Sequence, residues 1–257
     1  LFRSALSSTY AGTLNAGAGA TLLFTGNGGT HSVNALMTGA GTYAFNNNGT
    51  SSVTGSYTGN GTLSVSNGTV TFNTGTAMTP GAIVLTGGTT SFNSVQLVST
   101  ASLTLSSATM AGSGNMTLTG SGTMNSSVLT GSGTLTIGAG ASLITTGPNT
   151  QIWSGGRVVE NFGSLTLAGP QTVRLDTGGA TVNNKATGVF TFADDSTFSN
   201  NSGVITFVND GVAQKTGGTG TSFFGQFTNN AGGTVQATSG RSEEHTSELQ
   251  SRLHLVC

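Results

Sequence analysis

Apolar residues recur in pairs along the first half of the chain, with one residue between the members of each pair. The pairs are Leu22/Phe24, Tyr43/Phe45, Leu63/Val65, Ile83/Leu85 and Leu103/Leu105. Their first members recur at a nearly constant interval of about 20 residues. Because alternate side chains of a strand point to opposite sides, each pair predicts a strand with one face in a core and the other in solvent.

A second apolar column follows half a period later, at Val33, Val53, Phe72, Phe92, Met110 and Leu129. Turn signals such as Asn27-Gly28 and Asn48-Gly49 separate the two columns. Hairpins of an antiparallel sandwich need no such long register, whereas a solenoid stacks like residues over like. Residues 1–240 are therefore predicted to be all-β, a parallel β-helix (β-solenoid) of about 20 residues per coil. Each coil has at least two inward-facing strands, and Leu63 lies beside Tyr43 and Ile83.

The composition narrows the class of protein. Only 6% of the 257 residues are charged, against about 25% in an average soluble domain. The stretch from Ser4 to Gly156 has no charged residue, and the net charge of −1 gives no attraction to nucleic acid or anionic membranes. Apolar runs stay far below the roughly 20 residues of a spanning helix, so this segment is not expected to insert into a membrane.

Cysteine usage and the first residue bear on export. The single cysteine is Cys257, so residues 1–240 have neither disulfides nor cysteine metal sites, which suits translocation. The chain starts at Leu1 without a recognisable signal segment. We therefore interpret the start as a truncation, with any secretion signal upstream.

A different repeat follows residue 155. An apolar residue, one further residue, asparagines, a glycine turn and an alternating strand recur in the segments 182–192, 198–207 and 227–235, with a fainter copy at 159–167. Together with Gly-x-Gly-Thr-Leu units such as 59–65, these motifs resemble autotransporter passenger domains and filamentous-haemagglutinin-like adhesins. The resemblance covers most of residues 20–240.

The resemblance implies a right-handed parallel β-helix that is secreted and displayed on the bacterial outer surface. It implies adhesion or a stalk function without a cofactor, with cell-surface or polysaccharide ligands. Self-association through coil ends is also expected, because an uncapped strand edge is a template for pairing.

The last seventeen residues have another character. The segment 241–251 is similar to a translated short-read sequencing adapter, codon by codon. We expect residues 241–257 to be a non-native tail, so that its histidines, glutamates and Cys257 carry no function.

The candidates for chemistry within 1–240 are few: Glu160, Asp176, Asp194, Asp195, Asp210, Arg157, Arg174, Lys185, Lys215 and His31. Asp194, Asp195 and Asp210 would approach one another if a single short coil separated the first two from the third. Such a group would bind Ca²⁺ or cleave a glycoside, as in a polysaccharide lyase or glycosidase. Aspartate also favours turns, and we interpret the three aspartates as solvated turn residues. On this interpretation the protein is not an enzyme and has no catalytic, cofactor-binding or metal-binding residue.

Three further features define alternatives. His31 has no acidic or cysteine neighbour in sequence and is predicted to be a surface or turn histidine. A groove lined by Trp153, Tyr43 or Tyr57 would indicate a carbohydrate-binding module, although Trp153 also suits a packed position. An ice-binding face would need a regular threonine ladder, but the outward positions beside the first apolar column are irregular, as at Ala82 and Val84.

Overall fold

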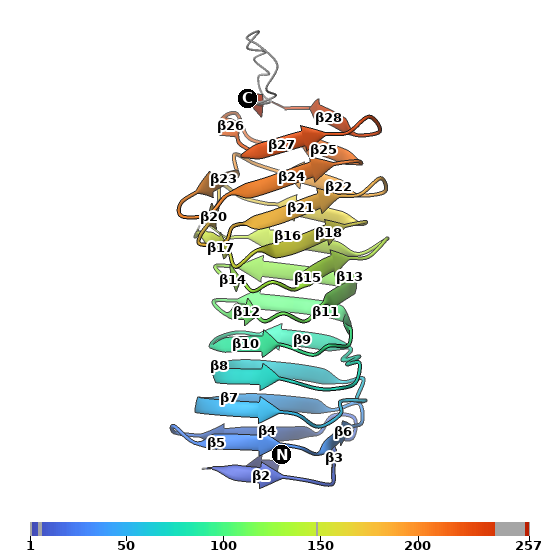
Figure 1. The fold of residues 1–257 in the computed structure, drawn as a ribbon, viewed down its shortest axis with the longest axis vertical. Helices are drawn as coiled ribbons and strands as arrows, with labels where there is room; N and C mark the ends of the chain where they lie inside the picture. Colours follow the sequence, from blue (N-terminus) through green and yellow to red (C-terminus); the bar gives the residue numbers. More distant parts are fainter. Residues whose placement is uncertain (1, 5–6, 148, 240–254, 257) are drawn as a thin grey trace. The chain divides into compact units, whose positions relative to one another are not determined.

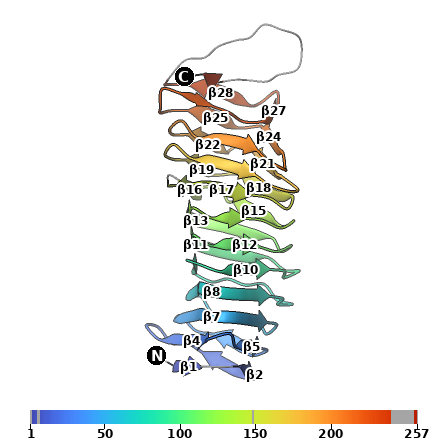
Figure 2. The ribbon, with the colours of Figure 1, turned by 90° about the vertical axis from the view of Figure 1, so that its left-hand side faces the viewer.

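Parallel strands stacked in coils make up the structure, a computed structural model that describes residues 2–4, 7–147, 149–239 and 255–256. The described residues form strands and turns without a helix. The chain divides into two units, Leu1–Thr119 and Gly120–Cys257. Each is a β-solenoid whose coils lie roughly 21 residues apart in sequence (Figures 1 and 2). The predicted fold class is confirmed.

Two strand stacks and a shorter third side form the first unit. The first stack, called the β4 stack, contains β1 (Phe2–Ser4), β4 (Thr21–Gly26), the first halves of β7 (Thr42–Val53) and β8 (Thr62–Phe72), β9 (Ala82–Leu85) and the second half of β11 (Val98–Ser106). The second, the β5 stack, contains β2 (Ser8–Tyr10), β5 (Thr30–Val33), the second halves of β7 and β8, β10 (Thr89–Phe92) and β12 (Thr109–Ala111).

The register in the first unit follows the first apolar column. Leu63 pairs in parallel with Tyr43 on one side and Ile83 on the other, as predicted. Ile83 in turn pairs with Leu103. From Tyr43 onward the members of this column are buried, because strand alternation turns each of them inward.

A third side closes each coil of this unit. It contains β3 (Thr13–Asn15), β6 (Leu36–Thr38) and the isolated parallel bridges Met37–Tyr57 and Met78–Val98. Met37, Tyr57, Met78 and Val98 are fully buried. Each of these four is the one large apolar residue of its segment and its inward neighbours are small or polar, as Ala35 and Thr100 are. No repeated apolar pair marks this side, so the sequence predicted only two of the three sides.

The second apolar column needs a correction at Met110. Met110 pairs with Thr90 rather than with Phe92. The position that follows in register is Gly112, which has a φ of +107° and whose added Cβ would lie 2.2 Å from the Phe92 carbonyl oxygen. The backbone passes too close to Phe92 for a larger side chain, so the apolar residue of this coil stands two positions earlier.

Three stacks form the second unit. The β15 stack contains β15 (Thr134–Ile137), β18 (Arg157–Asn161), β21 (Ala180–Asn184), β24 (Ile205–Asn209) and β27 (Gln226–Asn229). The β16 stack contains the end of β13 (Met116–Asn125), β16 (Ser142–Thr146), β19 (Ser164–Leu167), β22 (Val189–Phe192), β25 (Val212–Lys215) and β28 (Thr234–Ala237). The β14 stack contains β14 (Val128–Leu129), β17 (Gln151–Trp153), β20 (Thr172–Leu175) and β23 (Thr197–Asn200).

The repeat copy predicted at 198–207 is out of register. Phe198 stacks on Val173 in the β14 stack, whereas Val182 pairs with Val159 and Phe207 in the β15 stack. The interval from Val182 to Phe198 is therefore a step around one coil, not from one coil to the next. The structural equivalents of Val182 are Val159, Phe207 and Phe227.

Aromatic rings fill much of the core of this unit. Phe190 lies 4.8 Å from Phe207 and 5.6 Å from Phe224 between ring centroids, and Trp153 packs edge-on against Phe198 at 5.8 Å. Trp153 is fully buried. Its packed position agrees with one of the two alternatives drawn from the sequence.

Most of the expected non-native tail, residues 241–254 and 257, lies outside the described residues. Residues 255–256 form β29 (Leu255–Val256), which pairs antiparallel with β26 (Thr221–Ser222). The origin of the tail stays a prediction. Among the described residues, no helix has the length and apolar character needed to cross a membrane.

Candidate functional site

The three candidate acids occupy two different corners of the second unit. Asp194 and Asp195 follow β22 and lead from the β16 stack to the β14 stack. Asp210 follows β24 and leads from the β15 stack to the β16 stack, where its carboxylate accepts a hydrogen bond from Asn230 Nδ2 (2.6 Å). The backbone nitrogen of Asp210 donates to the carbonyl oxygen of Asn184, which identifies its neighbour in the preceding coil. The approach of Asp210 to Asp194 and Asp195, which the enzymatic alternative required, is therefore not found, and the three aspartates lie in turns as the main interpretation predicted.

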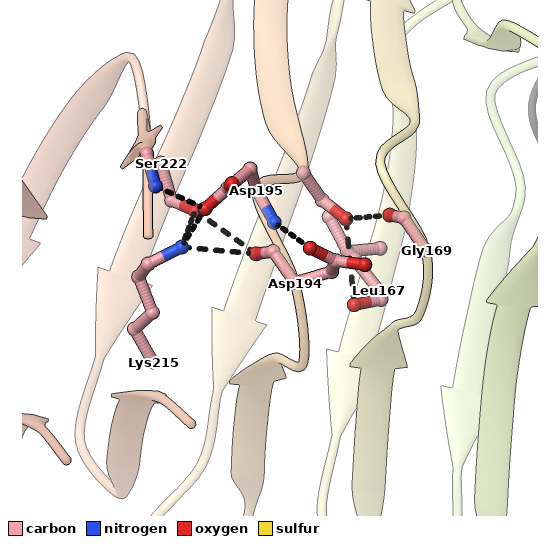
Figure 3. A network of polar contacts seen from close by, with 8 residues as sticks. Leu167, Gly169, Asp194, Asp195, Lys215 and Ser222 are labelled. Carbon is pink, nitrogen blue, oxygen red and sulfur yellow. Dashed lines mark hydrogen bonds and ion pairs between the residues drawn. The ribbon is translucent and has the colours of Figure 1, made fainter. Parts of the chain in front are cut away.

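Asp195 instead meets a lysine that is completely buried. Lys215 ends β25 with an exposed fraction of 0%. Its Nζ donates to Asp195 Oδ1 (2.8 Å), the carbonyl oxygen of Asp194 (3.1 Å) and Ser222 Oγ (3.1 Å), as Figure 3 shows. These three bonds use all three N–H groups of the ammonium. The Asp195 side chain, 33% exposed, is the only one of this pair in contact with solvent.

Strand alternation places Lys215 at this buried position. Ala213 and Lys215 point inward in β25, directly over Phe190 and Phe192 of β22. The four-carbon stem of the lysine continues the apolar column, and the ammonium reaches the corner formed by Asp194 and Asp195. The turn at Gly220 completes the site by donating its backbone N–H to Asp195 Oδ1 (2.9 Å).

Ser196, which directly follows Asp195, adds a second hydroxyl to this corner and links it to the preceding coil. Ser196 Oγ donates to the carbonyl oxygen of Gly169 (2.5 Å), and Ser222 Oγ donates to that of Asp194 (3.3 Å) (Figure 3). Both serines are fully buried. We call Asp194, Asp195, Ser196, Lys215 and Ser222 the lysine cluster.

The lysine cluster has the residue types of a serine–lysine nucleophile pair, but not the required geometry. Activation of a serine needs a neutral amine that accepts the hydroxyl proton. Here the Nζ of Lys215 donates to Ser222 Oγ and also forms an ion pair with Asp195. The hydrogen bond and charge of Lys215 in turn lower the pKa of Asp195. The cluster joins one coil to the next through the bonds of Lys215 to Asp194 and Asp195.

The other charged residues of the second unit also bridge neighbours. Arg174 contacts Asp176 through two hydrogen bonds of 2.9 and 2.8 Å, and this partly exposed pair lies within one strand end. Lys185 lies 2.5 Å from Glu160, which also accepts from Asn183.

Arg157 is buried, as Lys215 is, and its Nε donates to the Thr130 carbonyl oxygen (3.1 Å). Burial lowers the pKa of Arg157 to about 10.

A buried asparagine ladder runs up the β15 stack. Asn161, Asn184 and Asn209 each donate through Nδ2 to Oδ1 of the next asparagine, at 2.7 Å each time, and the ladder ends at Asn229. The same amide groups donate to backbone carbonyls, as Asn184 does to Val212 (2.9 Å). Sequence reasoning noticed the asparagines but not their stacking. Each of these asparagines stands two residues after an inward apolar residue, and strand alternation therefore indicates that its side chain also points inward.

The prediction for His31 was wrong. Its side chain is fully buried in β5, with its ring 6.1 Å from that of Tyr10 and 5.9 Å from that of Phe24. Neither ring nitrogen makes a hydrogen bond of ordinary geometry. Burial lowers the pKa of His31, and the Thr25 backbone partly opposes this effect. His31 faces inward because it is two residues before Val33.

The aromatic residues considered for a carbohydrate groove are core residues. Tyr43, Tyr57 and Trp153 are all fully buried. Tyr43 Oη donates within the third side of the first unit, with the Leu14 carbonyl oxygen at 2.5 Å, and burial raises the pKa of both Tyr43 and Tyr57. They support no aromatic platform.

A shallow hollow of about 190 Å³ lies in the described surface of the first unit. Its lining is the loop 93–97 with Ser113 and Asn115. Among the residues that the structure describes, no three His, Cys, Asp or Glu side chains are grouped in a way that could hold a metal ion.

Comparisons with known proteins add no relative to this geometry. No protein-family model, no curated protein and no solved structure matches the chain.

Proposed function

We propose that residues 1–240 are a non-catalytic structural and adhesive segment of an exported bacterial surface protein. The observation that carries this proposal is the lysine cluster, in which the buried charge is consumed by bonds between coils. The sequence resemblance to adhesin repeats and the absence of cysteine before Cys257 support display outside the cell.

The adhesive part of the proposal rests on the surface chemistry. Outward strand positions carry mainly threonine, serine and asparagine, which donate and accept hydrogen bonds without charge. Such groups make weak contacts with neutral glycans, and many weak contacts become useful only when copies act together. The ligand class that we propose is therefore the polysaccharide or cell-surface glycan, bound in a multivalent way.

The test compares dense and sparse display of the full chain. Beads carrying many copies, beads carrying few copies and the free protein are applied above 0 °C to surfaces coated with dextran, mannan or intact bacterial cells. We expect retention of the dense beads only, because avidity adds without any new contact. Equal washing-off of all three from every surface would contradict adhesion.

Catalysis is tested on the same protein with polygalacturonate, alginate and xylan. We expect neither unsaturated products nor new reducing ends after long incubation. Turnover that is lost in Lys215→Met, with folding retained, would overturn the structural role of the lysine cluster and favour the alternative of a β-helix carbohydrate-active enzyme.

A further inference from the structure

One face of the first unit presents a regular array of hydroxyl groups. Outward positions from β5 to β12 of the β5 stack form two columns, the first of Thr30, Thr50, Thr69, Thr89 and Thr109, and the second of Ser32, Ser52, Thr71 and Ser91, which ends where β12 carries Ala111. Each member is paired in register with the next through parallel strands. Figure 1 shows β5, β7, β8, β10 and β12 one after another along this side of the unit. We call these nine residues the hydroxyl face.

The spacing of the hydroxyl face follows from sheet geometry. Neighbouring strands lie about 4.8 Å apart, and alternate residues of one strand are roughly 6.6 Å apart. The face is therefore a two-dimensional lattice of side chains. Threonine is restricted at χ1 by its branched Cβ, so its hydroxyl and methyl groups repeat with little conformational freedom.

The protein itself uses almost none of these hydroxyls. Within the described residues, the only hydrogen bond to another protein group joins Thr30 Oγ1 and Thr50 Oγ1 at 3.4 Å. The remaining hydroxyls of the face are left to hydrogen-bond with water. The lattice of side chains imposes its own repeat on that water.

Two further properties keep this water layer regular. No charged residue stands between Ser4 and Gly156, so no charged side chain belongs to the strands of the hydroxyl face and orients water there. The threonine methyl groups separate the hydroxyls with apolar surface that offers water no competing partner. An uncharged lattice whose repeats are near those between equivalent oxygens of hexagonal ice suits the surface of crystalline water better than a soluble ligand.

The array is specific to the β5 stack. The corresponding columns of the β4 stack are interrupted by Ala82 in one and by Leu23, Ala44 and Val84 in the other. In the second unit an outward position of β20 carries Arg174. Sequence reasoning considered an ice-binding ladder only beside the first apolar column, which lies on the irregular side.

We propose that the hydroxyl face is an ice-binding surface, which adsorbs to a growing ice crystal through the water layer that it orders. The test uses the full chain with Thr69→Lys at the centre of the hydroxyl face. The matched control is Thr62→Lys, which adds the same charge to the same strand but on the β4 stack.

Protein is partitioned between a slowly growing ice hemisphere and the remaining liquid, and ice recrystallisation is followed by microscopy. We expect wild type and Thr62→Lys to be enriched in the ice, and Thr69→Lys to lose about tenfold in that enrichment, equivalent to about 1.4 kcal/mol. Thr69→Val keeps the shape and methyl group but removes the hydroxyl, and we expect an intermediate loss. Circular dichroism establishes that each variant is folded.

Three outcomes would overturn the proposal. Wild type could be excluded from ice like an unrelated soluble protein, or Thr62→Lys could lose as much as Thr69→Lys. Retention on crystalline cellulose or chitin together with exclusion from ice would identify the hydroxyl face as a polysaccharide surface instead. The proposed multivalent adhesion is measured above freezing, so its result is independent of this one.

Discussion

The two units have the same fold but treat buried polar groups differently. In the second unit, two networks of buried polar side chains link several coils, the lysine cluster and the ladder through Asn184, whereas the first unit has a smaller link of this kind between Thr74 and Ser94. In the first unit, Tyr57 and Thr90 have buried hydroxyls without a hydrogen-bond partner, and His31 has two such nitrogens. In the second unit, Asn161 and Gln171 lack a partner only at an oxygen, and their amide nitrogens are bonded, whereas Trp153 Nε1 and Ser239 Oγ have no partner.

This difference teaches that an inward polar residue is not by itself a stabilising feature. A satisfied buried group is expensive to remove because its partners are left unpaired, whereas an unsatisfied one already carries its desolvation penalty. Removal of the polar group should therefore destabilise the protein at Asn184, whose amide is bonded, and stabilise it at Thr90, whose hydroxyl is not.

Natural fluorophores allow the units to be followed separately. The only tryptophan, Trp153, is in the second unit, and the three tyrosines, Tyr10, Tyr43 and Tyr57, are all in the first. Denaturant unfolding monitored by tryptophan emission reports the second unit, and tyrosine emission reports the first.

The largest effect is expected for Asn184→Leu. The substitution removes the acceptor of Asn161 and the donor to Asn209 and to the Val212 carbonyl. With about 1–3 kcal/mol for each buried group left unpaired, we expect a loss of about 3–5 kcal/mol in the tryptophan transition. An unchanged tryptophan midpoint would mean that the ladder is not stabilising.

A smaller effect should distinguish the two members of the ion pair. Asp195→Asn leaves the Lys215 ammonium buried without its carboxylate, and we expect a loss of about 2 kcal/mol. The loss stays below the 3–5 kcal/mol of a fully buried pair because Asp195 is partly exposed. Lys215→Met, which keeps the apolar stem, should change stability by less than about 1 kcal/mol. Equal losses in both variants would contradict this interpretation.

The stability of the two units should depend on pH over different pH ranges. The folded state binds the His31 proton less readily than the unfolded chain, so the first unit loses stability as pH falls below the ordinary histidine value of 6.5, until the lowered pKa is reached. For Asp195, whose folded pKa lies below 3.8, the contribution is complete above 3.8 and is lost only as pH falls further.

The measurement is the tyrosine and tryptophan midpoint at pH 7.5, 6.5, 5.5 and 4.5. We expect the tyrosine midpoint alone to fall, and His31→Phe to flatten its dependence. A tyrosine midpoint that falls equally in His31→Phe would assign the effect to another group.

The smallest effect is expected for Thr90→Val, with a gain of up to about 1 kcal/mol. Thr90 is fully buried, pairs with Val70 and Met110, and its hydroxyl has no partner. Valine has the same shape and removes the penalty of the buried hydroxyl. Tyrosine emission measures the change, and a loss in place of this gain would show that the hydroxyl is bonded in solution.

Much of the fold was present in the spacing of apolar residues. The column through Tyr43, Leu63 and Ile83 predicted parallel register because each member recurs after one coil. The third side of the first unit was not predictable in this way, since residues such as Met37 and Tyr57 stand alone in their segments.

The polar interior was missed because polarity was taken as evidence of exposure. His31 is two residues before Val33, and Lys215 two after Ala213, so alternation alone places both inward. Strand alternation cannot predict which residue an inward polar side chain will bond to. The contact between Lys215 and Asp195 depends on the path of a corner, whose length differs from coil to coil.

That variation in length has a genetic consequence. From Val159 the equivalent positions follow at Val182, Phe207 and Phe227, so the intervals are unequal, yet the strands stay in register. Corners absorb insertions and deletions, while the strands require only that inward residues keep their parity. Because each coil bonds to the coils above and below it, misaligned recombination that duplicates or removes a whole coil leaves both new neighbours with a matching surface. A gene encoding such a chain can change in length by entire coils without passing through an unfolded product.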